Sequence, residues 1–150
     1  MKILKAMLGA AFYIILFIIL PRLLLEKVPP DILIPFRPIQ NILTVLTVLG
    51  LILAALYATK TLTPKHKPVN LAASVGLEFA EFYIFLFFIG FGDPTSFGIV
   101  EKAIPMGPER VTLMFDFRIF ILLLLVVLAI KVIVTFLKFY HAKNNQMLAT

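Results

Sequence analysis

Three ionisable residues occur inside strongly apolar stretches of the chain. Glu78 and Glu81 lie in the third of these stretches and Lys131 lies in the fourth. An ionised side chain within a bilayer costs several kcal/mol unless it is paired, hydrated or neutralised. Glu78 and Lys131 each lie seven residues, or ~10 Å of helix, inside the same expected membrane boundary. The sequence therefore predicts a buried ion pair between Glu78 and Lys131, with Glu81 left to be neutralised, hydrogen-bonded or hydrated.

Smaller polar side chains continue on the same helical faces. Ser74 precedes Glu78 by four residues, and Thr135 follows Lys131 by four. Residues three or four apart share one helix face, so these side chains form two matching polar stripes. In the other direction, Phe85 is the next side chain on the face of Glu81. The pattern predicts a polar pocket that opens on one side of the membrane and is closed by apolar groups on the other.

Two interpretations of these polar residues stay open. As a structural ion pair they would hold two helices together, and as a proton- or cation-handling site their carboxylates would change occupancy during function. One lysine cannot neutralise both acids, which favours the second interpretation. The outer halves of the same two stretches lack polar groups, which favours the first.

Metal and cofactor chemistry finds no support in the residue types. The chain has no cysteine, and its two histidines, His66 and His141, fall outside the apolar stretches. Thiolate ligands, iron–sulfur clusters and the Glu-x-x-His pairs of di-iron bundles are therefore missing. Neither a nucleophile elbow nor a Gly-rich phosphate loop is present. We expect no metal, no cofactor and no enzymatic activity.

The elements that position these residues are membrane helices. The chain has 150 residues, of which 61% are hydrophobic and 15% charged, with a mean hydropathy of +1.04, which excludes a soluble globular domain. Apolar segments of about 20 residues suffice to span a bilayer, and continuous apolar runs lack the alternation of barrel strands. We therefore predict one all-α transmembrane domain, residues 1–150, forming an antiparallel up-down bundle of four transmembrane helices. The predicted spans are residues 3–25, 39–58, 71–91 and 115–137.

Local signals refine the ends of these helices. Pro21 predicts a bend near the end of the first span, and Asn70 is a candidate cap at the start of the third. The loop 92–107 predicts a short interfacial helix that begins at Asp93 and ends before Pro105. The fourth helix is expected to begin outside the bilayer and to run into it through Val111 and the residues after it.

The charges predict the orientation of the chain. The face that holds both termini carries seven lysines and no acidic residue, whereas the opposite face carries six basic and six acidic residues. This asymmetry predicts a cell-membrane protein with both termini cytoplasmic. Lys60, Lys65 and Lys67 are expected to contact anionic lipid headgroups there. Nucleic acid is not an expected partner, because these lysines are not interleaved with aromatic residues.

A stripe of small residues predicts close helix packing. Ala72, Gly76 and Ala80 recur every four residues in the third span, which allows another helix to approach closely. That helix can belong to the same chain or to a partner. Phenylalanine and tyrosine are also concentrated in this span, and they favour a surface that faces lipid or another subunit.

These observations predict a small non-catalytic integral membrane subunit. It would pack into and stabilise a larger membrane protein complex, of the kind that transduces energy, with the bilayer and other integral membrane subunits as partners. The alternative is a homo-oligomeric proton- or cation-coupled transporter or channel that uses Glu78, Glu81 and Lys131. A membrane-embedded enzyme with the two acids as acid and base is a third option.

Overall fold

The computed structural model describes residues 1–27, 39–90, 99–106 and 109–148. The chain begins with three consecutive helical segments, α1 (Lys2–Ile14), the π-helix η1 (Ile15–Ile19) and α2 (Leu20–Lys27). Two long helices follow, α3 (Ile39–Leu62) and α4 (Pro68–Ile89). A β-hairpin, β1 (Ile99–Met106) and β2 (Glu109–Asp116), then leads into the longest helix, α5 (Arg118–Met147).

Four helices in the described part of the chain are long and apolar enough to cross a membrane. They are Lys2–Leu24, Asn41–Leu62, Pro68–Ile89 and Arg118–Met147. Helices of this length and apolarity are therefore present in the predicted number and at about the predicted positions, a pattern consistent with a multi-pass membrane protein. The fourth helix differs most from the prediction, since it begins three residues later and continues through the polar residues after 137.

The first helix passes through Pro21 without ending. Proline lacks an amide hydrogen and its ring collides with the carbonyl group four residues earlier, so a regular helix cannot continue unchanged. Here the backbone widens to a π-helix over Ile15–Ile19, and the amide of Leu20 donates to the carbonyl oxygen of Ile15, five residues back. The wider π-turn accommodates the proline ring, and α2 continues to Lys27.

The short connection between α3 and α4 is closed by one amide side chain. Asn70 Nδ2 donates to the carbonyl oxygens of Lys60, at 2.6 Å, and Thr63, at 2.9 Å. The expectation that Asn70 caps the start of the third span is therefore wrong. Lys67 occupies the N-cap position of α4 without a side-chain cap, and Pro68 takes the first helical position. Asn70 instead satisfies carbonyl groups that the end of α3 leaves free.

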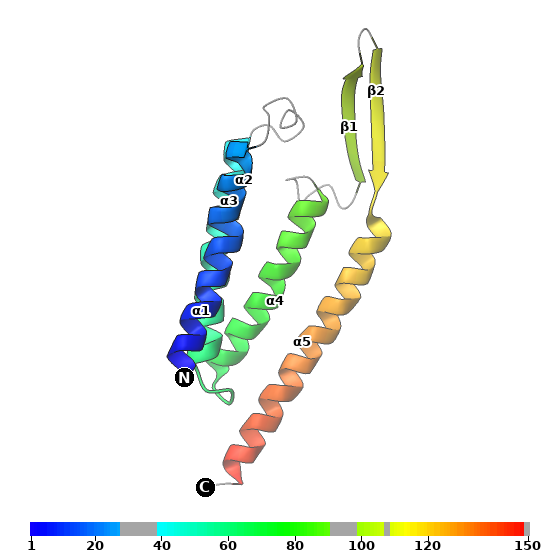
Figure 1. Cartoon of the computed structure of the whole chain (residues 1–150). Coiled ribbons are helices and arrows are strands. Elements are labelled where there is room, and N and C mark those ends of the chain that lie inside the picture. Colours follow the sequence, from blue (N-terminus) through cyan, green and yellow to red (C-terminus); the bar gives the residue numbers. More distant parts are fainter. Residues whose placement is uncertain (28–38, 91–98, 107–108, 149–150) are drawn as a thin grey trace.

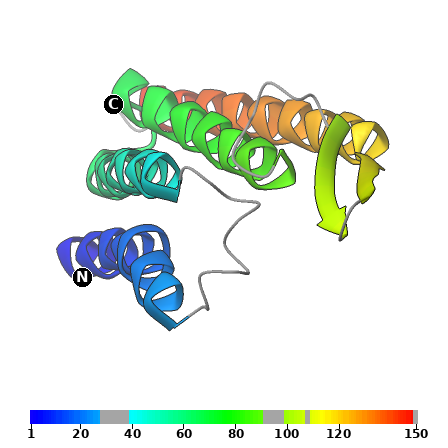
Figure 2. The ribbon, with the colours of Figure 1, turned by 90° about the horizontal axis from the view of Figure 1, so that it is seen from above.

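The four long helices form a row. The main contacts join α1 to α3, α3 to α4, and α4 to α5, and the chain direction alternates along the row (Figures 1 and 2). Both termini and the α3–α4 connection lie at one end, and the β-hairpin lies at the other (Figure 1). The core is small, with Leu53 of α3 fully buried against Leu77 and Ile84 of α4.

Glycines allow the closest helix contacts. A Cβ at Gly9 would lie 2.5 Å from Tyr57 Cζ, and a Cβ at Gly50 would lie 2.9 Å from Phe17 Cβ. Gly9 lies in the contact of α1 with α3 and Gly50 in the contact of η1 with α3, where sequence reasoning predicted no stripe. Of the predicted stripe, Gly76 faces Leu56 and Ala80 packs beside the core, whereas Ala72 is exposed.

The segment before α5 is a β-hairpin. The strands pair antiparallel, with Ile99 opposite Asp116 and Ile104 opposite Val111. The predicted interfacial helix is therefore wrong over residues 99–106, and its first part lies outside the described residues. The early start of the fourth helix is wrong as well. The Gly-Pro pair at 107–108 is a turn signal, and Pro105 is acceptable because both strands of a two-stranded sheet are edge strands.

Candidate functional site

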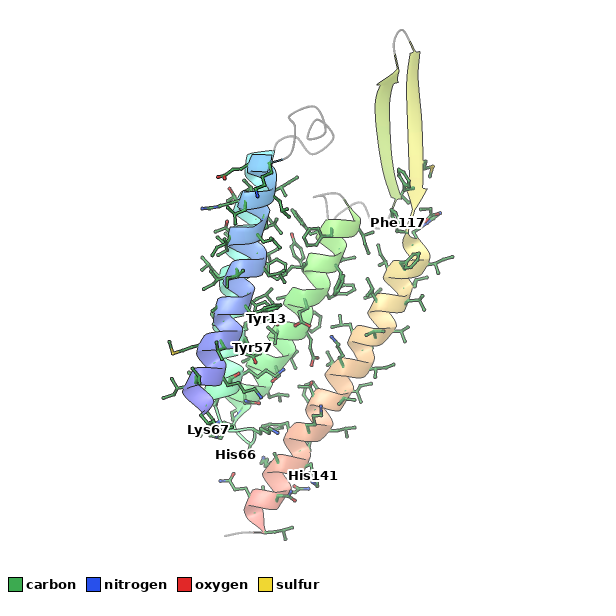
Figure 3. All side chains as sticks on the ribbon, in the orientation of Figure 1. Tyr13, Tyr57, His66, Lys67, Phe117 and His141 are labelled. Atoms are coloured by element: carbon green, nitrogen blue, oxygen red, sulfur yellow. The ribbon has the colours of Figure 1, made fainter. Side chains whose placement is uncertain are left out.

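Glu81 connects three helices through its carboxylate. Tyr13, on α1, donates its hydroxyl to Glu81 Oε1 at 3.0 Å. Lys131, on α5, places its Nζ 3.5 Å from Glu81 Oε2. The two oxygens of one acid on α4 are thus engaged by helices on either side of it. Tyr13 lies in the last turn of α1, and Figure 3 labels it about halfway along the continuous helix that α1, η1 and α2 form.

Glu78 lies one turn away and has a different partner. Thr135 donates its hydroxyl to Glu78 Oε1 at 2.6 Å. The second oxygen, Oε2, is buried and has no hydrogen-bond partner among the described residues. The predicted Glu78–Lys131 pair is therefore wrong, because Lys131 pairs with Glu81.

The difference comes from the register of α4 against α5. The sequence prediction placed Glu78 opposite Lys131 because both residues lie at the same depth below the predicted span boundaries. In the structure Glu78 lies opposite Thr135 and Glu81 lies opposite Lys131, so α5 is displaced by about one turn. The step from Glu78 to Glu81 is three residues forward along α4, and the matching step from Thr135 to Lys131 is four residues backward along α5. Boundaries inferred from hydropathy are accurate to only a few residues, which is enough to exchange the two acids.

The ion pair is also more exposed within this chain than predicted. The side chain of Lys131 is 53% exposed and that of Glu81 is 32% exposed. Since α5 packs mainly on α4, nothing in the described part of the chain covers the outer side of the pair. The prediction of a buried pair is therefore wrong for the single chain.

A polar pocket of about 270 Å³ leads to Glu78 from the end that holds the termini. Its walls come from the end of α3, the α3–α4 connection, α4 and α5. Buried Ser74 lies on one wall and Thr135 on another. Three lysines also line it: Lys60, Lys65 and Lys138. The structure thus brings Ser74, Glu78 and Thr135 together as the sequence pattern predicts, whereas Lys67 does not line this pocket.

Beyond Glu78 the space between α4 and α5 narrows. A second cavity of about 60 Å³ contains Glu78, Glu81 and Lys131 together with aromatic and aliphatic side chains. The apolar part of this lining is Phe82, Phe85, Leu124, Val127 and Leu128. The lining beyond Glu78 is therefore mostly apolar and includes Phe85, the phenylalanine that follows Glu81 on its face, while Lys131 in the same lining stays exposed.

Sequence reasoning missed the two tyrosines beside this site. Tyr13 and Tyr57 lie with their ring centroids 5.7 Å apart, and only Tyr13 reaches Glu81. Buried tyrosine hydroxyls usually find a hydrogen-bond partner, and tyrosine is enriched at membrane interfaces. A tyrosine in the middle of an apolar span is thus a signal that points to a polar partner on another helix.

A second charged contact marks the junction of the hairpin and α5. Arg118 donates from Nη2 to Asp116 Oδ2 at 2.6 Å, and its backbone amide donates to Asp116 Oδ1 at 3.0 Å. These hydrogen bonds lower the pKa of Asp116 from 3.8 to about 2. The pair is exposed, and the hydrogen bond from the Arg118 amide satisfies one of the backbone donors that the start of α5 leaves free.

Comparisons with protein-family models, curated proteins and solved structures found no match to this chain. Among the described residues, no three histidine, cysteine or acidic side chains cluster as a metal site would require. What these residues can do follows from their geometry. They offer an ion pair on an open helix flank and a carboxylate at the floor of a polar pocket.

Proposed function

We propose that this chain is a membrane-spanning, non-catalytic subunit of a larger membrane protein complex. It would cross the cell membrane as four antiparallel helices, with both termini cytoplasmic and a β-hairpin on the opposite face. The observation that carries the proposal is the exposed Lys131–Glu81 pair on the flank of α4 and α5.

The depth of this pair makes its exposure unfavourable in lipid. Lys131 is thirteen residues from the start of α5, which places it ~20 Å along the helix. Charged side chains at such depths almost always face protein or a water-filled cavity. The end helix of the row is the one that carries Lys131, so a partner seated against α5 would complete its surroundings.

The first test is the composition of the native particle. The protein is extracted from its own membrane in mild detergent, without overexpression, and the mass of the particle is measured. We expect other polypeptides at fixed stoichiometry. A particle that contains only this chain would refute the subunit proposal.

The second test locates the contact. The natural chain has no cysteine, so single cysteines report without interference. Val134 lies three residues from Lys131 on the same helix face, whereas Ile133 points away from that face, and both are exposed. A photoactivatable cross-linker on Val134→Cys is expected to capture the partner, and the same reagent on Ile133→Cys serves as the matched control. Equal capture from both positions would contradict a partner on the Lys131 flank.

A second candidate function is supported by Glu78. Its Oε2 is buried without a hydrogen-bond partner among the described residues, and the same side chain lines a polar pocket, as a proton- or cation-binding carboxylate would. In a homo-oligomeric transporter, Glu78→Gln and Glu81→Gln would leave assembly intact and abolish coupled flux across proteoliposomes. If the chain is instead a non-catalytic subunit, no coupled flux is expected from the wild type or from either variant. Glu81→Gln would then weaken assembly, because it removes the partner of Lys131.

A further inference from the structure

Three lysines from separate parts of the chain meet at the pocket below Glu78. Lys60 lies in the last turn of α3, Lys65 in the α3–α4 connection and Lys138 on α5. The amide of Asn70, which lies in the same lining, holds the end of α3 against the start of α4. The positions of Lys60 and Lys65 are thus set by the fold around the pocket.

The charge of this pocket is unbalanced. Among the described residues, no acidic side chain forms an ion pair with Lys60, Lys65 or Lys138. The acid in the lining is Glu78, at the far end, and it already accepts a hydrogen bond from Thr135. The three lysines therefore belong to the end of the lining at the α3–α4 connection, whereas Glu78 lies two turns further along α4, so an anion is favoured at the lysine end.

We propose that this pocket binds the phosphate group of an anionic membrane lipid. Basic pockets between transmembrane helices are suited to lipid headgroups, and ammonium groups donate strong hydrogen bonds to phosphate oxygens. Leu71 and Phe139 in the same lining offer apolar contact to the acyl chains of such a lipid. The inference rests on the membrane placement proposed above but not on any partner subunit.

The size of the pocket fits this ligand. Its volume of about 270 Å³ is several times the ~30 Å³ that one water occupies in the liquid. A phosphate group and bridging waters can enter together. The α3–α4 connection, which contributes to the lining, lies at the end of the helices that carries both termini (Figure 1), where the expected headgroup layer of the membrane begins.

The test measures lipid retention by the purified full-length chain. The protein is equilibrated with vesicles of phosphatidylcholine and phosphatidylglycerol in equal parts, solubilised, and analysed by native mass spectrometry. One variant carries Lys60→Gln, Lys65→Gln and Lys138→Gln. The matched control carries Lys2→Gln, Lys5→Gln and Lys143→Gln, which removes the same charge from the same end of the molecule. Far-UV circular dichroism verifies that both variants keep their helices.

We expect the wild type and the control to retain phosphatidylglycerol in preference to phosphatidylcholine. At about fivefold for each lysine, the pocket variant should lose affinity on the order of a hundredfold. Equal retention by the pocket variant and the control would overturn the proposal. So would equal loss in both variants, because the effect would then be unspecific surface charge.

A second arm separates lipid from free phosphate. Lys65 is exposed, and its labelling by an amine-reactive reagent is followed by peptide mass spectrometry. Phosphatidylglycerol vesicles should slow the labelling of Lys65 more than that of neighbouring Lys67. Protection by inorganic phosphate alone, at the same phosphate concentration, would assign the site to a free phosphate and refute the lipid. A native particle that contains only this chain would refute the subunit proposal and leave this result unchanged.

Discussion

The contact between Gly9 and Tyr57 makes a sharp prediction about how α1 is held to α3. A methyl group added at Gly9 would lie 2.5 Å from Tyr57 Cζ, 2.6 Å from Cδ1 and closer still to Cε1. Non-bonded carbon atoms prefer ~3.5–4.0 Å, so the ring would have to move by more than ~1 Å. That movement would disturb the packing of Tyr57 on Tyr13, whose ring centroid lies 5.7 Å away.

The magnitude follows from two opposing effects. Overpacking of this kind costs about 1–3 kcal/mol. Replacing glycine by alanine inside a helix returns about 0.5–1 kcal/mol. We therefore expect Gly9→Ala to lower the free energy of unfolding by about 1–2 kcal/mol. Gly76→Ala is the matched control, because its methyl group would lie 3.4 Å from the flexible end of Leu56. It should leave stability unchanged or raise it by up to about 1 kcal/mol.

The assay is reversible unfolding of the purified chain in mixed detergent micelles. The chain has no tryptophan, and two of its four tyrosines, Tyr13 and Tyr57, lie at the α1–α3 contact, so unfolding is followed by tyrosine fluorescence, to which this contact contributes. In a Tyr57→Ala background the collision disappears, and Gly9→Ala should become neutral or stabilising. A double-mutant coupling energy near zero would refute the reasoning, as would equal effects of Gly9→Ala and Gly76→Ala.

Two further predictions concern single polar contacts. Tyr13→Phe removes the hydrogen bond to Glu81 and should destabilise the chain in the same unfolding assay by about 0.6 kcal/mol, the average for such bonds between membrane helices. Tyr57→Phe is its control, because the Tyr57 hydroxyl has no hydrogen bond to another described residue, and equal losses in both variants would contradict the assignment. The Asp116 carboxyl should titrate by NMR with a midpoint at a pH of about 2, and in Arg118→Gln the midpoint should return toward 3.8. Because the folded chain has the lower pKa, the contact contributes fully to the free energy of unfolding above pH 3.8. That contribution is lost as the pH falls through about 2. A wild-type midpoint near 3.8 would show that Arg118 does not hold this carboxylate.

Some of the site followed from spacing along one helix. Ser74 and Glu78 are four residues apart, as are Lys131 and Thr135, and such pairs share a face in any helix. The polar pocket, with mostly apolar side chains beyond it, was predictable for that reason. The role of Asn70 was not, because its acceptors lie in the last turn of α3 and just after it, and its residue type suits either end of a helix.

The sequence alone determined that the chain has four helices of membrane-spanning length, because apolar runs of that length and the need to satisfy every backbone polar group are local properties. Tertiary structure decided which acid meets Lys131, because a displacement of one turn between α4 and α5 exchanges Glu78 for Glu81 without changing either helix. Tertiary structure also decided that Tyr13 reaches Glu81 and that Gly9 lies against Tyr57, since both depend on how α1 packs in the row. The hairpin before α5 depends on pairing between two segments, and a strand with no partner leaves its own hydrogen-bonding groups unsatisfied.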